Sequence, residues 1–281
     1  MVVGTTKGGT TSLDLYLGRH PEIFMARPKE PRFFHADART SCWDRGLDWY
    51  RSQFITNKRL CGEASPVYSQ WPARPLAAER MHEIIPQARL IYVVREPVAR
   101  LRSHYLMDVR AGETEAAFPE YLEEAHYALD ASRYGTQLRN FLRFFPLERI
   151  LVIESAELLR HTHATMAEVF RFLGVDPGFS SPLFYHRRNV SKSQTFPSAR
   201  GRALLNSRAM ALMRKHLKSQ IFYHLRNALL RPFRVAPPSL ALPEAAERKL
   251  RAEMKSEIAL LRELTGLALA SLDTPPLDTA G

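Results

Sequence analysis

Hydrophobic residues in this chain form short continuous runs that alternate with stretches of helical period. The runs Leu90–Val94 and 149–154 are typical of strands that are buried on both faces of a parallel sheet. Between them, apolar residues recur at helical spacing from Leu138 to Phe145 and stop before Pro146. Strands that alternate with helices predict an α/β fold, in which a central parallel sheet is flanked by helices.

The same pattern gives bounds for the remaining elements. Further strands are predicted at residues 1–3 and 59–62, and further helices at 12–17, 75–85 and 155–173. Ser155 would cap the last of these helices and Gly174 would end it. After the pair Pro237-Pro238 a final helix is predicted, which should end at Gly266. Its inward positions are Leu250, Met254, Ile258 and Leu261.

The length of the chain bounds its organisation. A chain of 281 residues can bury one substantial core. We therefore expect a single domain over residues 1–272 and a disordered, proline-containing tail over residues 273–281.

Residues 4–11 read GTTKGGTT and follow the first short strand. A glycine-rich turn between a strand and a helix directs backbone N–H groups and the positive end of the helix dipole at an anion. The nucleoside-triphosphate form, GxxxxGK[ST], has lysine directly after the second glycine. Here Thr10 occupies that position, and the only lysine of the loop is Lys7. The sequence therefore predicts a phosphate-binding loop that suits ATP with magnesium poorly. It is formed by Lys7, Gly8, Gly9, Thr10 and Thr11; a turn without a ligand is the alternative.

A second anion site is predicted at the end of the strand Leu90–Val94. A nucleoside triphosphatase would have an aspartate near this point to hold magnesium. This strand is followed instead by Arg95, whose guanidinium can contact two phosphate oxygens. Ser103 follows eight residues later in a predicted helix. Two anion sites without a metal ligand suggest a nucleotide that carries two separate anionic groups.

These motifs resemble the sulfotransferases that use 3′-phosphoadenosine-5′-phosphosulfate (PAPS), and the likeness runs from Gly4 to about Pro197. In the heparan sulfate branch, the catalytic-glutamate motif is KE[VI]HFFD, and residues 29–35 read KEPRFFH. Further similar segments are GEASPVY at 62–68, NFLRFFPL at 140–147 and SKSQTFP at 191–197, where the branch has SKGR before a proline.

The resemblance implies a three-layer P-loop-like fold and a role for each matching residue. Glu30 would be the catalytic base, and Lys7 would neutralise the leaving phosphate. The first loop would hold the 5′-phosphosulfate, and Arg95 with Ser103 would hold the 3′-phosphate. Further cofactor contacts would come from the SKGR-like segment: Lys192, Ser193 and Gln194. The product would be 3′-phosphoadenosine-5′-phosphate (PAP), and no metal would be required.

Several departures from the family pattern leave the acceptor open. Arg32 replaces the motif histidine, His35 replaces its aspartate, and Ala64 replaces a lysine near the acceptor. A glycan, a lipid, a peptide or a small metabolite would all fit. His35 and Glu63 are further candidates for the base. Glu30 could instead be a surface carboxylate paired with Arg27 or Arg32.

Composition limits the cellular setting and the partners. The net charge of +11 would suit nucleic acid, but the basic residues are scattered and no nucleic-acid-binding motif accompanies them. A positive field also attracts a polyanionic cofactor. Two cysteines are too few for a disulfide framework or a zinc cluster. No apolar run approaches the roughly 20 residues of a membrane span. We expect a cytoplasmic enzyme without a signal peptide, whose first strand could begin one or two residues upstream.

Residues 210–235 interleave basic and apolar side chains. Such a stretch can lie on a membrane or an anionic acceptor, or it can pack on the core with a solvated basic face. For the whole chain, a metal-dependent kinase or nucleoside triphosphatase is one alternative, which the displaced Lys7 and Arg95 oppose. A non-catalytic nucleotide-binding protein is the other, and it would be favoured if Glu30 pointed away from the phosphate loop.

Overall fold

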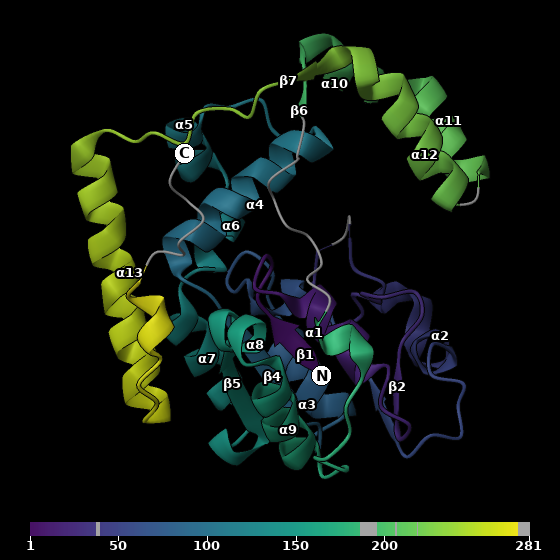
Figure 1. The fold of residues 1–281 in the computed structure, drawn as a ribbon, viewed down its shortest axis with the longest axis vertical. Helices are drawn as coiled ribbons and strands as arrows, with labels where there is room; N and C mark the ends of the chain where they lie inside the picture. Colours follow the sequence, from purple (N-terminus) through teal and green to yellow (C-terminus); the bar gives the residue numbers. More distant parts are fainter. Residues whose placement is uncertain (38–39, 186–195, 206, 218, 275–281) are drawn as a thin grey trace. The chain divides into compact units, whose positions relative to one another are not determined.

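Short parallel strands form the centre of the computed structural model, which describes residues 1–37, 40–185, 196–205, 207–217 and 219–274. Three strands, β1 (Val2–Gly4), β4 (Leu90–Val94) and β5 (Ile150–Glu154), pair in that order. A second pair is formed by β2 (Ile23–Met25) and β3 (Leu60–Gly62). Figure 1 shows the strands surrounded by helices.

A single bridge joins the two groups of strands. The Val2 N–H donates to the Glu63 carbonyl at 2.8 Å, and the Ser65 N–H donates to the Val2 carbonyl at 3.2 Å. The strands therefore lie in the order β2-β3-β1-β4-β5, and each neighbouring pair is parallel. Because all strands run in one direction, their carboxyl ends share one edge, where folds of this kind bind ligands.

Helices cover both faces of this sheet. Alternate residues of β4 face opposite sides: Leu90, Tyr92 and Val94 pack in one hydrophobic cluster and Ile91 and Val93 in the other. The first cluster includes residues of α3 (Ala77–Ile84), α7 (Tyr134–Leu142) and α13 (Glu244–Thr265). The second includes residues of α1 (Thr10–Leu17), α8 (Ser155–Arg160) and α9 (Thr162–Leu173). This confirms the predicted three-layer α/β fold.

The helix predicted over 155–173 is interrupted. His161 leaves the helical conformation and separates α8 from α9. The Thr162 hydroxyl donates to the Leu158 carbonyl at 2.8 Å, a local bond that competes with the helical ladder. The N-cap of α8 is Glu154 and not the predicted Ser155, which is the first helical residue, and no side-chain bond caps the helix. The strand β2 was not predicted, because three residues are too few for a recognisable period.

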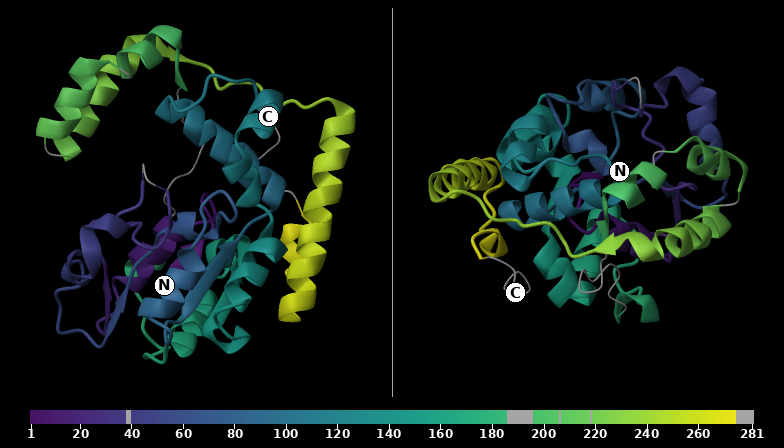
Figure 2. Two further views of the ribbon diagram at one scale, coloured as in Figure 1. Left: turned by 180° about the vertical axis from the view of Figure 1, so that it is seen from behind. Right: turned by 90° about the horizontal axis from the view of Figure 1, so that it is seen from above.

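The C-terminal helix packs along α7, as Figure 2 shows from two sides. The four predicted inward residues of α13 are all buried, and Gly266 follows the helix with a φ of 69°. A Cβ at Gly135 of α7 would lie 2.6 Å from the Leu260 side chain, so glycine allows the close approach. Beyond α13, the backbone N–H of Ser271 donates to the Glu154 carboxylate at 2.8 Å, beside β5.

Contacts within the chain divide it into two compact units. The first comprises residues 1–101, 125–188 and 244–281 and contains the sheet. The second comprises residues 102–124 and 189–243. The chain passes repeatedly between them, so the single domain expected over 1–272 stays a prediction. The last described residue is Thr274, so most of the expected tail lies outside the described residues.

The second unit consists mainly of helices. Besides most of α4 (Pro97–Ala111), its elements are α5 (Phe118–Glu124), α10 (Ala199–Leu205), α11 (Arg208–His216), α12 (Ser219–Leu230), and the antiparallel pair β6 (Phe196–Pro197) and β7 (Arg234–Val235). Tyr105 packs against Phe118 and Tyr121, and Arg202 pairs with Glu115 at 2.7 Å. No helix among the residues described is both long and apolar enough to span a bilayer.

Candidate phosphate-binding and catalytic site

The phosphate loop occupies the turn between β1 and α1. The Thr5 N–H donates to the Val93 carbonyl of β4 at 2.9 Å, and the Gly8 N–H donates to the Thr5 carbonyl at 2.8 Å. Gly9 has a φ of 102°, which glycine adopts readily. A Cβ at Gly8 would lie 3.0 Å from both of those carbonyl oxygens. The loop conformation therefore requires both glycines.

Two arginines hold the carbonyl groups of this loop. The buried Arg100 donates to the Thr6 carbonyl at 3.2 Å and to Ser132 Oγ at 2.7 Å. Arg95 donates to the Lys7 carbonyl at 3.2 Å. The first N–H groups of α1 have no acceptor within the helix, which makes this end an anion site. The Gly8 N–H was expected in the same cradle, but it closes the turn instead.

Gln70 was not predicted as part of the loop. It follows the short helix Pro66–Ser69, is 1% exposed, and donates from Nε2 to Thr6 Oγ1 at 3.2 Å. Its Oε1 has no hydrogen-bond partner among the residues that the structure describes. Arg100 was likewise not predicted to support the loop. Neither belongs to a recognisable motif, so only the fold reveals that they support the loop.

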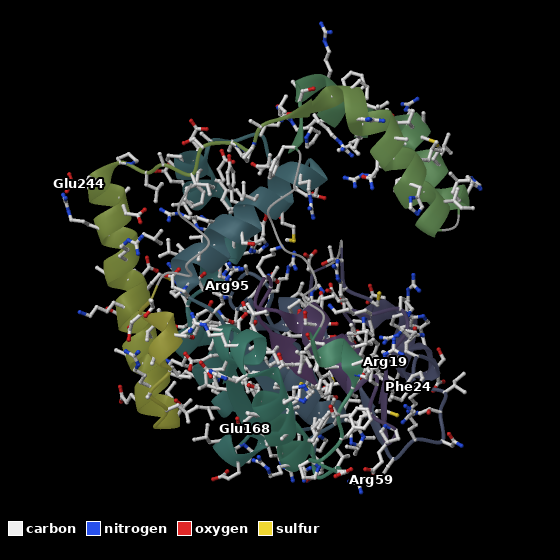
Figure 3. The ribbon with its side chains drawn as sticks, in the orientation of Figure 1. Arg19, Phe24, Arg59, Arg95, Glu168 and Glu244 are labelled. Atoms are coloured by element: carbon white, nitrogen blue, oxygen red, sulfur yellow. The ribbon has the colours of Figure 1, made fainter. Side chains whose placement is uncertain are left out.

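Arg95 lies at the carboxyl edge of the sheet, directly after β4 (Figure 3). The Tyr134 hydroxyl donates to its carbonyl at 2.7 Å and fixes the backbone. Burial lowers the pKa of Arg95, yet no carboxylate forms an ion pair with it in the described part of the chain. Ser103 lies in the portion of α4 that belongs to the second unit. The shared 3′-phosphate site of Arg95 and Ser103 stays a prediction.

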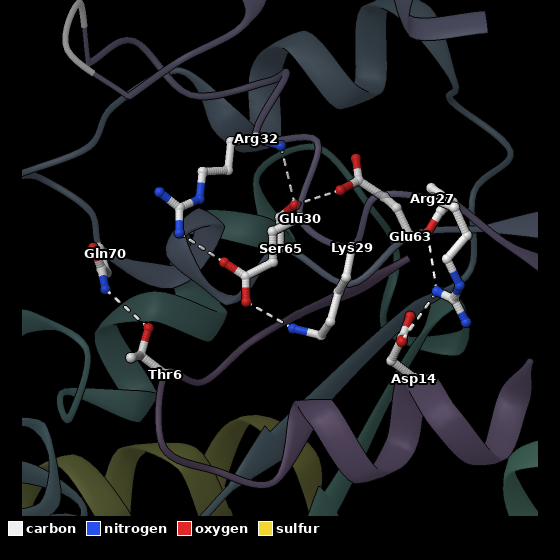
Figure 4. Close-up of polar contacts among 10 residues, drawn as sticks. Thr6, Asp14, Arg27, Lys29, Glu30, Arg32, Glu63, Ser65 and Gln70 are labelled. Atoms are coloured by element: carbon white, nitrogen blue, oxygen red, sulfur yellow. Dashed lines mark hydrogen bonds and ion pairs between the residues drawn. The ribbon is translucent and has the colours of Figure 1, made fainter. Parts of the chain in front are cut away.

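Glu30 lies in the segment 29–34, which we call the Glu30 loop. One carboxylate oxygen accepts from Lys29 Nζ at 2.7 Å and the other from the Arg32 guanidinium at 2.9 Å (Figure 4). Its side chain is 25% exposed. Burial acts to raise the pKa of Glu30, but the charges and hydrogen bonds of Lys29 and Arg32 hold it below its ordinary value. The carboxylate is therefore ionised at neutral pH.

In Figure 4 the Glu30 carboxylate points toward α1, the helix that begins at the phosphate loop. Burial is the main cause that raises the pKa of Asp14 on α1, and the nearby charge of Glu30 adds to it. Arg27, one of the two predicted partners of Glu30, pairs with Asp14 at 3.2 Å instead. The predicted pairing with Arg32 is present, but it does not turn Glu30 away from the phosphate loop. Each carboxylate oxygen keeps a second lone pair that can accept a proton.

The backbone of the Glu30 loop is strained. Glu30 and Arg32 have φ values of 61° and 54°, in a region that costs non-glycine residues roughly 1–3 kcal/mol each. The following Phe33 and Phe34 anchor the loop in the core, where the Phe33 ring stacks on Tyr50 at 4.6 Å. The KEPRFFH motif thus combines a half-buried charged half with a buried aromatic half.

The other candidate bases are buried behind the loop. His35 is fully buried, its Nδ1 accepts the Asp37 N–H at 3.2 Å, and burial lowers its pKa to about 4. Glu63 is 1% exposed, and burial raises its pKa. Neither side chain reaches solvent. Lys192, Ser193 and Gln194 lie outside the described residues.

A cavity of about 750 Å³ opens at the opposite end of the sheet, where the strands begin. Figure 3 marks that end by Arg59, which precedes β3 and lies far from Arg95. The lining of the cavity includes Met1, Arg59, Arg89 and Arg149, which lie at the amino ends of the strands. Parallel α/β sheets bind ligands at the carboxyl ends, so this cavity is separate from the phosphate loop.

Comparison with known proteins places these features in a family. A model of the sulfotransferase family matches residues 24–180, more than half of the chain. The chain belongs to the sulfotransferase family. The match includes Glu30, Arg95 and Ser103 and begins after the phosphate loop.

Individual sulfotransferases show the same relationship. The chain is 30% identical to mouse heparan sulfate glucosamine 3-O-sulfotransferase 6 over 195 residues, which are 66% of this chain and 54% of that protein. It is 27% identical to mouse bifunctional heparan sulfate N-deacetylase/N-sulfotransferase 4 over 225 residues, or 72% and 24% of the two chains. The chain thus spans about half of the first relative and a quarter of the second.

A solved structure supports the fold over the whole length. A sulfotransferase from Alicyclobacillus acidocaldarius superposes with a TM-score of 0.66 over 97% of both chains, at 23% sequence identity. The resemblance to sulfotransferases and the P-loop-like fold are confirmed.

Proposed function

We propose that the protein transfers a sulfuryl group from PAPS to a hydroxyl or amine of an acceptor by in-line displacement. The observation that carries this proposal is the Glu30 carboxylate, which lies between Lys29 and Arg32 and points toward the helix that begins at a phosphate loop (Figure 4). Arg95 and Arg100 donate hydrogen bonds to carbonyl groups of this loop. A triphosphatase would instead have a magnesium-binding aspartate near the end of the neighbouring strand.

Each residue has a separate role in this reaction. Glu30 takes the proton of the acceptor as its oxygen or nitrogen forms a bond to sulfur. The bond between sulfur and the bridging oxygen breaks, and its electron pair stays on the 5′-phosphate of PAP. Lys7 and the N–H groups at the start of α1 stabilise that growing negative charge. Arg95 with Ser103, and the segment containing Lys192, Ser193 and Gln194, would hold the rest of the nucleotide.

The protein's own cations would neutralise the phosphates, so the proposed reaction requires no metal. No group of three acidic, histidine or cysteine side chains suited to a metal occurs in the described part of the chain. A nucleotide kinase or triphosphatase, or a non-catalytic nucleotide-binding protein, remains the alternative to be tested. We expect a cytoplasmic enzyme that does not bind nucleic acid.

A glycan, a lipid or a small metabolite is the proposed class of acceptor. The curated relatives above carry names that refer to heparan sulfate. In this chain Ala64 is 1% exposed and forms the bridge to β1, so it presents no cation to an acceptor. We therefore propose an acceptor other than heparan sulfate.

The second unit carries a surface that suits an anionic membrane. Ile221, Leu225 and Leu229 lie four residues apart on α12 and are 53%, 39% and 38% exposed, so they form one exposed apolar stripe. No aspartate or glutamate occurs between Asp176 and Glu244. An apolar stripe in a purely basic segment is typical of helices that lie on anionic lipid.

Vesicle flotation tests this contact. We expect the protein to float with phosphatidylglycerol vesicles at low salt and not with phosphatidylcholine vesicles. The variant Ile221→Ser/Leu225→Ser/Leu229→Ser should stay at the bottom of the gradient. Leu159→Ser, which alters an equally exposed leucine of α8 in the first unit (52% exposed), is the control. Flotation of the triple variant with these vesicles would assign the stripe to another role.

Calorimetry with two nucleotides tests the catalytic proposal itself. PAP should bind without metal, and ATP with magnesium should bind far more weakly. The loop has Thr10 where a magnesium nucleotide needs a lysine, and Arg95 follows the neighbouring strand where an aspartate would be needed. Equal affinities for PAP and for ATP with magnesium, or an absolute requirement for magnesium, would refute the proposed mechanism.

A further inference from the structure

A buried carboxylate lies directly behind the Glu30 loop. Glu63 follows β3 and is 1% exposed. Three hydroxyl groups donate to it: Ser65 Oγ at 2.5 Å, Tyr68 Oη at 2.9 Å and Tyr50 Oη at 3.0 Å. Because all three hydroxyls donate to its two oxygens, the Glu63 carboxyl group fixes the direction in which they point.

Two of these hydroxyls also hold the backbone of the Glu30 loop. The Arg32 N–H donates to Ser65 Oγ at 3.2 Å, and the Phe33 N–H donates to Tyr68 Oη at 2.9 Å. A hydroxyl has one hydrogen and two lone pairs, so it can donate to Glu63 and accept from the loop at once. The relay through Ser65 is drawn in Figure 4.

The position of these relays in the loop is significant. The two N–H groups belong to consecutive residues that follow Glu30 and Pro31, and both Glu30 and Arg32 have positive φ values. A strained backbone persists only where its surroundings fix it from several sides. Besides the contacts among its own charged residues, the loop accepts a hydrogen bond at the Arg32 carbonyl from the Cys42 N–H at 3.0 Å. The buried relays supply the support from behind.

We propose that Glu63 is a positioning residue for the reaction: through Ser65 and Tyr68 it fixes the backbone of the Glu30 loop and thereby places the Glu30 carboxylate. The inference rests on the proposed role of Glu30 as the base. It gives Glu63 a task other than proton transfer, for which its burial makes it unsuitable.

Two tyrosines provide a matched pair of variants. Tyr68 and Tyr50 are both buried, and both donate to the same Oε1 atom of Glu63. Only the Tyr68 hydroxyl also accepts an N–H of the loop. Tyr68→Phe and Tyr50→Phe thus remove the same group from Glu63 and retain the aromatic ring, but they differ in what the loop loses.

The first readout is catalytic. Turnover is followed as PAP released from PAPS, with 4-nitrophenol as the probe acceptor and with water as the acceptor-independent background. Tyr68→Phe should lower kcat by about tenfold to a hundredfold, a loss typical of a reacting group displaced by about 1 Å. Its affinity for PAP should stay within about twofold, because the phosphate loop is untouched. Tyr50→Phe should keep kcat within about threefold, while both variants lose similar thermal stability.

The second readout does not depend on an acceptor. Hydrogen exchange of the peptide that contains residues 29–34 should accelerate in Tyr68→Phe and not in Tyr50→Phe. The Glu30 carboxylate, followed by ¹³C NMR, should titrate at a higher pH in Tyr68→Phe, because a loosened loop weakens its contact with Arg32. The groups that face Glu30 are Lys29 and Arg32 of its own loop and Asp14 of α1.

The outcomes separate this inference from the proposed function. Equal losses of kcat and equal exchange in both tyrosine variants would make the Glu63 cluster a purely structural one and overturn the inference. The same holds if Tyr68→Phe behaves as the unaltered protein. If Glu30→Gln keeps full turnover, the proposed base is wrong and the positioning role falls with it. If Glu30→Gln is inactive and the two tyrosine variants agree, only the positioning role fails.

Discussion

Replacement of Arg95 by alanine should weaken the two ends of the bound nucleotide by different amounts. The guanidinium has five N–H donors, and one of them is directed to the Lys7 carbonyl at 3.2 Å. If the others hold the 3′-phosphate, truncation costs about 2–5 kcal/mol of PAP affinity, the usual loss for one partner of a buried charge pair. This corresponds to a loss of about 30-fold to several thousandfold.

The contact with Lys7 adds a smaller, shared effect. A hydrogen bond from a charged donor contributes about 1.5–3 kcal/mol. Because Arg95 is only half-buried, we expect its bond to Lys7 to contribute at the low end of that range. Adenosine-5′-phosphosulfate lacks the 3′-phosphate but uses the same loop, so its affinity should fall by about tenfold at most. The structure thus predicts a partial response of this ligand, because Arg95 also supports the loop.

Isothermal titration calorimetry without metal measures both ligands. Arg51→Ala, which removes a 70% exposed arginine of α2 (Gly46–Ser52), is the control for the change in net charge. Both affinities should stay unchanged in that control. If Arg95→Ala weakens PAP and adenosine-5′-phosphosulfate equally, Arg95 acts only through the loop, and the reasoning that assigns it to the 3′-phosphate is refuted.

Further variants test the other parts of the site. Lys7→Ala should lower turnover by roughly 10²–10³-fold, the loss typical of one donor to a developing charge, and should also weaken PAP binding in calorimetry. Glu30→Gln should lower turnover by about 10²–10⁴-fold with PAP affinity unchanged; retained turnover would move the base elsewhere. Arg32→Gln should raise the pKa of Glu30 towards its ordinary value. Since the base acts when ionised, the acid limb of the pH–rate profile should move to higher pH; an unmoved limb would refute the assignment of Glu30. Gly8→Ala would place a Cβ 3.0 Å from two backbone carbonyls and should destabilise the fold by about 1–3 kcal/mol in urea denaturation, with loss of PAP binding.

The elements with a continuous apolar run could be predicted closely from the sequence. The strand Leu90–Val94 has the predicted bounds, because five consecutive buried residues leave no ambiguity of period. The strand Ile23–Met25 was missed because it is too short to show one. The break at His161 was missed because it depends on a local side-chain bond within a stretch that is periodic on both sides.

The candidate site was predictable where a motif carries it and unpredictable where the fold assembles it. The motif identified Glu30, but not which of its cationic neighbours would bind it. Lys29 and Arg32 do, whereas Arg27 pairs with Asp14 of α1. Arg100 lies some 90 positions after the loop whose carbonyl it binds, and no local pattern in the sequence indicates such a pairing.

The segment after α13 has a consequence for the solubility of the protein. In the described sheet β5 is the outermost strand on one side, and unpaired edge strands readily pair with another chain. Leu269 and Leu272 are buried in the core cluster, and Ser271 binds Glu154 at the end of β5. The segment therefore shields the outer edge of the sheet from pairing with a neighbouring molecule. A chain shortened to Thr265 would keep every proposed catalytic group and still be prone to form intermolecular β-structure.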